Sequence, residues 1–198
     1  MKRLDTIFET VCEKAALLCG YLLILAAGYV SAELIARKLL GISLGGANEV
    51  SGYVLAVTTA WSFGYTMLKR SHIRIDVFTR GLSSKARAAT DLMSAISMVV
   101  FAGIFVWFAV GYLDFVWQRG TRSITTLAMP IWIPVLVWCA GWILFLAVCI
   151  YLALLGTRAF LRRDYGEVQL RIGSVMEEEE LIVSLEDRPV PPEQEGSR

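Results

Sequence analysis

The chain has 198 residues, of which 56% are hydrophobic, and its formal net charge at pH 7 is only +1. This charge balance excludes the strongly basic surface that a nucleic-acid-binding protein needs to neutralise phosphates. The apolar residues lie in long uncharged blocks, and the charged residues lie between the blocks. Because about 20 consecutive apolar residues cross a bilayer as a helix, this distribution predicts an all-α integral membrane protein with four transmembrane helices.

The first apolar block predicts a membrane span over residues 15–36. A signal peptide is the alternative, because Val30, Ser31 and Ala32 are small enough to precede a cleavage site. However, the region before the block is long and contains Asp5, Glu9 and Glu13, and the block itself is longer than a signal-peptide core. Apolar side chains recur at helical spacing over residues 4–11, which predicts a short amphipathic helix leading into the first span.

The second predicted span covers residues 49–68 and begins with Glu49. This stretch is uncharged after Glu49 and rich in small and hydroxyl residues, which favour close helix packing rather than contact with lipid. We therefore expect the second span to face protein more than lipid. Glu49 is favourable at the positive end of the helix dipole, and contact with an external partner explains it equally well.

A loop over residues 69–89 is expected next, followed by a third span over residues 91–117 whose bulky aromatic residues suit a surface facing lipid or a partner. The fourth span is predicted over residues 130–155. Pro130 is acceptable in its first turn, where the backbone N–H has no helical partner. Three tryptophans of this span, Trp132, Trp138 and Trp142, are expected in an aromatic belt at the outer membrane interface.

Residues 1–163 are thus expected to form one membrane domain, followed by a cytoplasmic acidic tail over residues 164–198. The tail is expected to be partly disordered, because its end is polar and rich in proline and acidic residues. An apolar segment in the middle of the tail, VQLRIGSV, is expected to fold weakly or to dock on a partner.

Lysine and arginine residues predict the orientation of the spans, because they accumulate on the cytoplasmic side. Twelve of them lie near span ends in the N-terminal segment, the 69–89 loop and the start of the tail, which are all on one side of the membrane. Four lie on the other side. This asymmetry predicts that both termini are cytoplasmic.

The ionisable residues and cysteines do not form a pattern that supports catalysis. His72 is the only histidine, and the four cysteines form no C-x-x-C pair, so they are expected to be buried free thiols. No enzymatic activity and no cofactor are therefore expected. Glu33 and Asp114 lie near span ends and are interpreted mainly as interfacial anchors, with Arg37 placed to pair with Glu33 at i, i+4. Since no span carries a charge at its middle, a coupled transport site within this chain alone is disfavoured.

The segment KRSHIRID follows the second span and contains Arg70, His72 and Asp76. One interpretation is an ordinary interfacial turn whose basic side chains meet lipid phosphates. The other is that Asp76 fixes His72 or an arginine and shapes a docking surface. Composition does not choose between the two.

Taken in order, these residues resemble those of a known family. An acid before the second span, an apolar helix with Trp61 and Gly64, and then His72-Ile73 and Asp76 are similar to the small membrane subunit (DctQ type) of tripartite ATP-independent periplasmic (TRAP) transporters. Asn48 stands where that family has a second acid. The resemblance continues at the start of the fourth span, with Thr126, Pro130, Trp132 and Gly141.

The resemblance implies a multi-pass subunit of the bacterial inner membrane that pairs with a large multispanning permease subunit and helps receive a periplasmic substrate-binding protein. It also implies sodium-coupled uptake of organic acids, with the sodium ions bound in the large subunit. The alternatives are a four-span scaffold of another membrane complex and a stand-alone small carrier. The residues expected at partner interfaces or in structural positions are Glu49, Trp61, Gly64, Arg70, His72, Asp76, Thr126, Pro130, Trp132 and Gly141.

Overall fold

The structure is a computed structural model that describes residues 2–43, 45–69, 82–124 and 127–172. Within these ranges the chain is helical, as the sequence predicts, and no strand is present beyond one isolated bridge. The helices are α1 (Lys2–Leu40), α2 (Ala47–Leu68), α3 (Ser84–Gln118), α4 (Trp132–Leu161) and α5 (Tyr165–Ile172).

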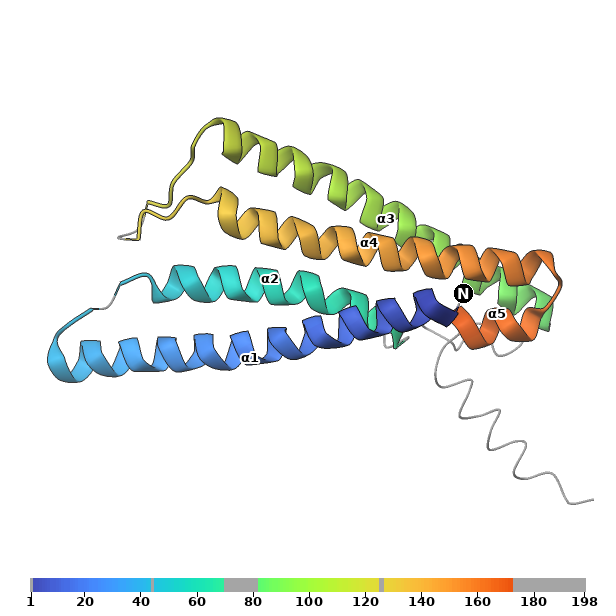
Figure 1. The fold of residues 1–198 in the computed structure, drawn as a ribbon, viewed down its shortest axis with the longest axis horizontal. Coiled ribbons are helices and arrows are strands. Elements are labelled where there is room, and N and C mark those ends of the chain that lie inside the picture. Colours follow the sequence, from blue (N-terminus) through green and yellow to red (C-terminus); the bar gives the residue numbers. More distant parts are fainter. Residues whose placement is uncertain (1, 44, 70–81, 125–126, 173–198) are drawn as a thin grey trace, which may run out of the picture.

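The four long helices lie side by side in the order α1, α2, α4, α3, so that neighbours in space are not always neighbours in sequence (Figure 1). Helix α2 packs against both α1 and α4, whereas α3 packs mainly against α4. The α1–α2 and α3–α4 loops lie together at one end of the bundle, which we call the loop end (Figure 1). The N-terminus of α1 and the short helix α5 lie at the opposite end, the terminal end.

Helix α1 is one continuous helix of 39 residues, so the predicted amphipathic segment and the first span are not separate elements. They merge because residues 2–19 contain neither glycine nor proline to interrupt the backbone hydrogen bonds. The start of α1 is also fixed by α4, where the Tyr151 hydroxyl donates a hydrogen bond to Asp5. The ring of Phe8 packs on that tyrosine at 5.0 Å between centroids.

Two predicted boundaries are wrong in detail. Helix α3 begins at Ser84, inside the expected 69–89 loop, because the Ser83 hydroxyl caps the helix by accepting a hydrogen bond from the Ala86 N–H at 3.4 Å. Helix α4 begins at Trp132, so Pro130 precedes the helix instead of lying in its first turn. Pro130 instead forms the isolated bridge with Arg122.

Among the helices of the described residues, three are long and apolar enough to cross a membrane: α1 over Asp5–Leu40, α3 over Ser84–Gln118 and α4 over Trp132–Leu161. Helix α2 is not among them. Its 22 residues would reach about 33 Å at roughly 1.5 Å per residue, but its serine, threonine, glycine and tyrosine residues lower its hydropathy. That α2 also crosses the membrane therefore stays a prediction.

The core of the bundle lies along the seam between α2 and α4. Phe63 of α2 packs against Trp142 and Phe145 of α4, with ring centroids 5.3 and 5.6 Å apart. Trp142, which the sequence placed in an interfacial belt, is only 7% exposed and belongs to this core. Phe105 of α3 completes the cluster, 3.9 Å from the Trp142 ring. Aromatic packing thus ties three helices together at the middle of the bundle.

The buried face of α3, the helix that packs against α4 and α5, carries a stripe of small residues repeating every seven positions. The members are buried to 3% exposure or less: Ala88, Ala95, Ala102, Ala109 and Val116. A seven-residue repeat keeps one face of a helix turned toward its partner, and small side chains let the backbones approach closely. The opposite side of α3 carries exposed aromatic residues, among them Trp107 and Phe108, as the sequence predicts.

Helix α5 folds back under α3 and α4 at the terminal end (Figure 1). Val168 of α5 is fully buried. The Ile172 side chain packs against Gly156 of α4, and its Cδ1 atom would lie only 2.7 Å from a Cβ built on that glycine. The first part of the segment expected to fold weakly or dock on a partner therefore docks on its own chain. The acidic block and the rest of the tail, residues 173–198, lie outside the described residues.

Candidate functional site

The loop end holds a carboxylate with an unusual position. Glu33 on α1 is only 2% exposed although it lies at the end of a membrane-length helix. It accepts hydrogen bonds from the Arg37 guanidinium, from the Ser43 hydroxyl at 3.2 Å and from the Ala47 N–H at 3.1 Å. The Arg37 pairing was expected from the i, i+4 spacing. The contacts with the loop and with α2 were not, because nothing in the sequence shows that the chain folds back onto Glu33.

A second hydrogen bond joins α1 to the same loop. The Tyr29 hydroxyl donates to the Gly45 carbonyl at 2.9 Å. Gly45 and Gly46 have φ angles of 73° and 74°, a region that residues with a Cβ rarely adopt. The two glycines let the chain turn sharply enough for α2 to start beside α1.

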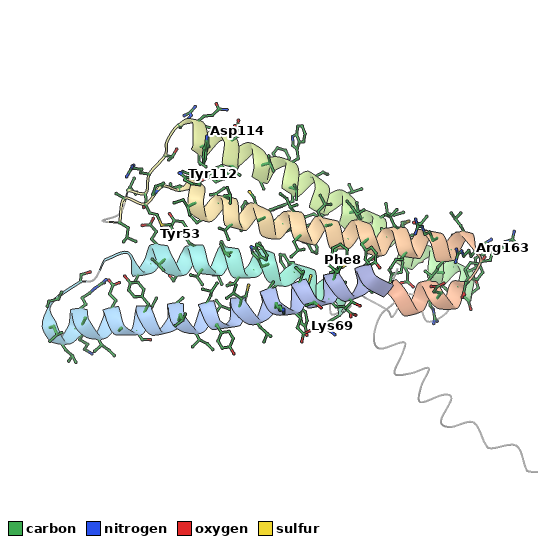
Figure 2. The ribbon with its side chains drawn as sticks, viewed as in Figure 1. Phe8, Tyr53, Lys69, Tyr112, Asp114 and Arg163 are labelled. Carbon is green, nitrogen blue, oxygen red and sulfur yellow. The ribbon has the colours of Figure 1, made fainter. Side chains whose placement is uncertain are left out.

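Glu49 lies in the first turn of α2 and is half-buried, as is its partner Tyr53. The Tyr53 hydroxyl donates to a Glu49 carboxylate oxygen at 2.6 Å. Ser123 of the α3–α4 loop is also hydrogen-bonded to the Tyr53 side chain, and Tyr112 of α3 is close enough to interact with it electrostatically. Figure 2 shows Tyr53 and Tyr112 at the loop end. Tyr53 therefore links the start of α2 to the other helical pair.

The two loops also touch directly. The side chain of Leu127, in the α3–α4 loop, occupies the space where a Cβ on Gly46 would lie. The α3–α4 loop is itself held by two backbone hydrogen bonds, from Ser123 N–H to the Met129 carbonyl at 2.9 Å and from Ile131 N–H to the Thr121 carbonyl at 3.1 Å. The loop end is thus one connected surface formed by both loops.

Trp132 and Pro130 lie on this surface. Trp132 starts α4 and packs edge to face on Trp117 of α3, with 4.7 Å between the ring centroids. Pro130 bridges to Arg122 within the α3–α4 loop. Both residues therefore fix how α3, the loop and α4 join, and they lie at the loop end with Glu49.

Three of the residues singled out by the sequence lie where two helices of this chain meet. Trp61 of α2 donates its indole N–H to the Val137 carbonyl of α4 at 2.9 Å, and it lies against Gly141. Gly64 is buried where α2 meets α1, since a Cβ built there would be 3.1 Å from the Cys12 sulfur. Trp61, Gly64 and Gly141 therefore occupy helix–helix contacts within this chain. Four further predicted residues lie outside the described residues: Arg70, His72, Asp76 and Thr126.

The comparisons with known proteins agree with the resemblance in the sequence. The family described as "Tripartite ATP-independent periplasmic transporters, DctQ component" matches residues 15–159. No curated protein and no solved structure matches the chain significantly. The family match begins within α1, ends near the end of α4 and so includes nearly all of the four-helix bundle. Members of this family are transporter components and not enzymes. The chain therefore belongs to the DctQ family, the small membrane subunits of TRAP transporters.

Proposed function

We propose that this chain is the small accessory subunit of a sodium-coupled, binding-protein-dependent importer of organic acids in the bacterial inner membrane. In this proposal it stabilises the large permease subunit and helps the periplasmic binding protein to dock. The observation that carries the proposal is the family match over residues 15–159, because TRAP transporters of this type associate with a large permease and a periplasmic binding protein.

In this proposal α2 crosses the membrane together with α1, α3 and α4, and both termini face the cytoplasm. Support for a membrane-spanning α2 comes from its position between α1 and α4, which buries Thr58 and Gly64 of α2 away from lipid. Support for the orientation comes from the lysines and arginines, twelve of which lie on the side of the termini and four on the side of the loop end. The loop end would then face the periplasm.

The loop end is the surface that we assign to the binding protein. It carries Glu49 in a fixed position through Tyr53, and the contact between Leu127 and Gly46 joins its two loops. A surface held in one conformation before docking loses less conformational entropy when a partner binds. Solute and sodium are assigned to the large subunit, because the spans of this chain carry no charge near their middles.

The experiment that tests the proposal is purification of the tagged full-length chain from its native membrane in mild detergent, followed by mass spectrometry of the proteins that accompany it. We expect a stoichiometric, much larger and very hydrophobic permease subunit, and a periplasmic binding protein captured by mild cross-linking before solubilisation. The same tag on an unrelated inner-membrane protein is the control.

The two alternatives give different results. A chain that purifies alone as a stable oligomer contradicts the accessory role and favours a stand-alone carrier, which uptake by vesicles containing only this protein would then test. A stoichiometric companion without the properties of a permease indicates a scaffold of another membrane complex.

A further inference from the structure

Glu33 differs from the other carboxylates near span ends because its charge is buried. Asp114 of α3 is exposed and accepts a hydrogen bond only from Gln118 on its own helix among the contacts described for it. Glu33, by contrast, is 2% exposed and accepts from three segments: α1 itself, the α1–α2 loop and the start of α2. A buried carboxylate is costly in free energy unless it is paired and hydrogen-bonded. Glu33 can therefore stay buried only while these donors remain in place.

The contact with α2 has a specific structural role. The N-terminal N–H groups of a helix have no partner within the helix, and a capping side chain usually accepts one of them. The cap residue of α2 is Gly46, which has no side chain to do this. Glu33 accepts the Ala47 N–H from a different helix, and its negative charge lies at the positive end of the α2 dipole. The cap of α2 is therefore supplied by α1.

The ion pair with Arg37 alone does not explain this arrangement. The Arg37 side chain is 61% exposed and the Glu33 side chain only 3%. An ion pair with one partner in solvent contributes little to stability. The two contacts that bury the carboxylate, with Ser43 and Ala47, are the ones that join α1 to the segment leading to Glu49.

We propose that Glu33 is a positioning residue, which holds the α1–α2 loop and the first turn of α2 in the arrangement that receives the binding protein. The proposal rests on the proposed function, because it takes the loop end as the docking surface. Glu33 acts through its neighbours. It fixes Ala47, and Glu49 follows two residues later on the same helical turn.

The test uses the intact complex of this chain with its large subunit in lipid nanodiscs, with Glu33→Gln compared with Asp114→Asn. Both changes replace a carboxylate by an amide at the loop end, but only Glu33 is bonded to the α1–α2 loop. The first readout is hydrogen exchange in peptides covering residues 45–50. We expect Glu33→Gln to accelerate exchange of the Ala47 amide by roughly tenfold, because the neutral amide oxygen of glutamine accepts a hydrogen bond more weakly than the carboxylate does. Asp114→Asn should leave it unchanged.

The second readout is the Kd of the complex for the fluorescently labelled binding protein that co-purifies with it. We expect Glu33→Gln to raise this Kd by roughly threefold to tenfold, since the loop must then be ordered on docking. Recovery of the large subunit and the Tm of the complex should not change. This combination separates positioning from a general loss of structure, which would lower both.

Ser43→Ala provides a milder variant if Glu33→Gln does not assemble, because it removes one donor and leaves the carboxylate in place. It should change both readouts in the same direction by a smaller factor. Unchanged exchange in residues 45–50 of either variant overturns the proposal. Faster exchange with an unchanged Kd also overturns it, while the family role stays intact. Failure of the unmodified chain to bring down a permease would instead contradict the proposed function.

Discussion

Trp61 of α2 lies in the space that Gly141 of α4 leaves by having no side chain. A Cβ built on Gly141 would lie 2.7 Å from the Trp61 ring, 2.9 Å from the Ala60 Cβ and 3.0 Å from the Ala60 backbone. One turn before Gly141 on α4, the Val137 carbonyl accepts a hydrogen bond from the Trp61 indole N–H. A large aromatic residue on one helix and a glycine on the other thus set how closely α2 and α4 approach.

This contact predicts that Gly141→Ala destabilises the protein. Alanine in place of glycine inside a helix ordinarily stabilises it by about 0.5–1 kcal/mol. Here we expect a loss of about 1–3 kcal/mol in the free energy of unfolding, because the Ala60 backbone cannot move aside as a flexible side chain could. Thermal unfolding in detergent measures the effect. The control is Gly103→Ala on α3, where a Cβ meets nothing within 4 Å. Equal Tm values for the two variants would contradict the close contact.

The alanine stripe on α3 gives a second prediction. Ala102→Leu should lower the free energy of unfolding by about 1–3 kcal/mol, because a larger side chain at a fully buried position forces α3 away from α4. Val100→Leu is the matched control, since Val100 is 54% exposed on the same helix. Thermal unfolding of the two variants measures the difference. If the Tm of Ala102→Leu equals that of Val100→Leu, α3 and α4 are not closely packed at Ala102.

Glu49→Gln tests the assignment of the loop end to the binding protein. We expect it to weaken binding-protein docking by about 1–2 kcal/mol, because the amide lacks the charge that a partner's donor would meet. Tyr53→Phe removes the hydroxyl that donates to Glu49 but keeps the charge, so its effect should be smaller. The Kd of the purified complex for the binding protein measures both. Docking and assembly that are unchanged in Glu49→Gln would remove Glu49 from the docking surface.

The proposed orientation predicts which introduced cysteines react from outside the cell. Asn48→Cys at the loop end should be labelled by a membrane-impermeant maleimide in intact spheroplasts, whereas Lys85→Cys near the start of α3 should be labelled only after the membrane is opened. Both side chains are exposed. The native cysteines give a low background, because Cys12, Cys19, Cys139 and Cys149 are buried. The reverse labelling pattern would invert the orientation and place the loop end in the cytoplasm.

Docking of α5 predicts the effect of a charge at its buried face. Val168→Asp should detach α5 from α4, since burying an unpaired carboxylate in place of the fully buried valine costs at least about 2 kcal/mol. Trypsin should then cleave faster after Arg162 and Arg163, which precede the helix. Gly166→Ala lies on an exposed position of the same helix and should leave the cleavage rate unchanged. Slow cleavage of both variants would mean that Val168 does not hold α5 in place.

Much of the helical arrangement could be read from the sequence. The apolar blocks predicted residues 15–36, 49–68, 91–117 and 130–155 as helical, and a helix covers each of them apart from residues 130–131. The family could be recognised as well, because its residues occur in order along the chain. The heptad of small residues in α3 is present in the sequence, but small residues are common in any membrane helix and do not by themselves identify its contact face.

The positions of individual residues at the site were harder to predict. Glu33 was interpreted mainly as an interfacial anchor, because its only visible partner was Arg37. Its burial results from Ser43 and Ala47, which reach it only when α2 turns back beside α1. Trp142 was expected at the membrane interface, but packing against Phe63 and Phe105 places it in the core.

The sequence by itself determined which segments are helical and which family the chain belongs to, because helix formation in a membrane depends on local apolar length and the family motifs are ordered along the chain. The tertiary structure alone decided that α4 lies between α2 and α3, that Gly141 receives Trp61 and that Glu33 caps α2. These contacts join residues far apart in sequence. Their geometry depends on how closely two helices approach, which hydrophobic periodicity does not specify.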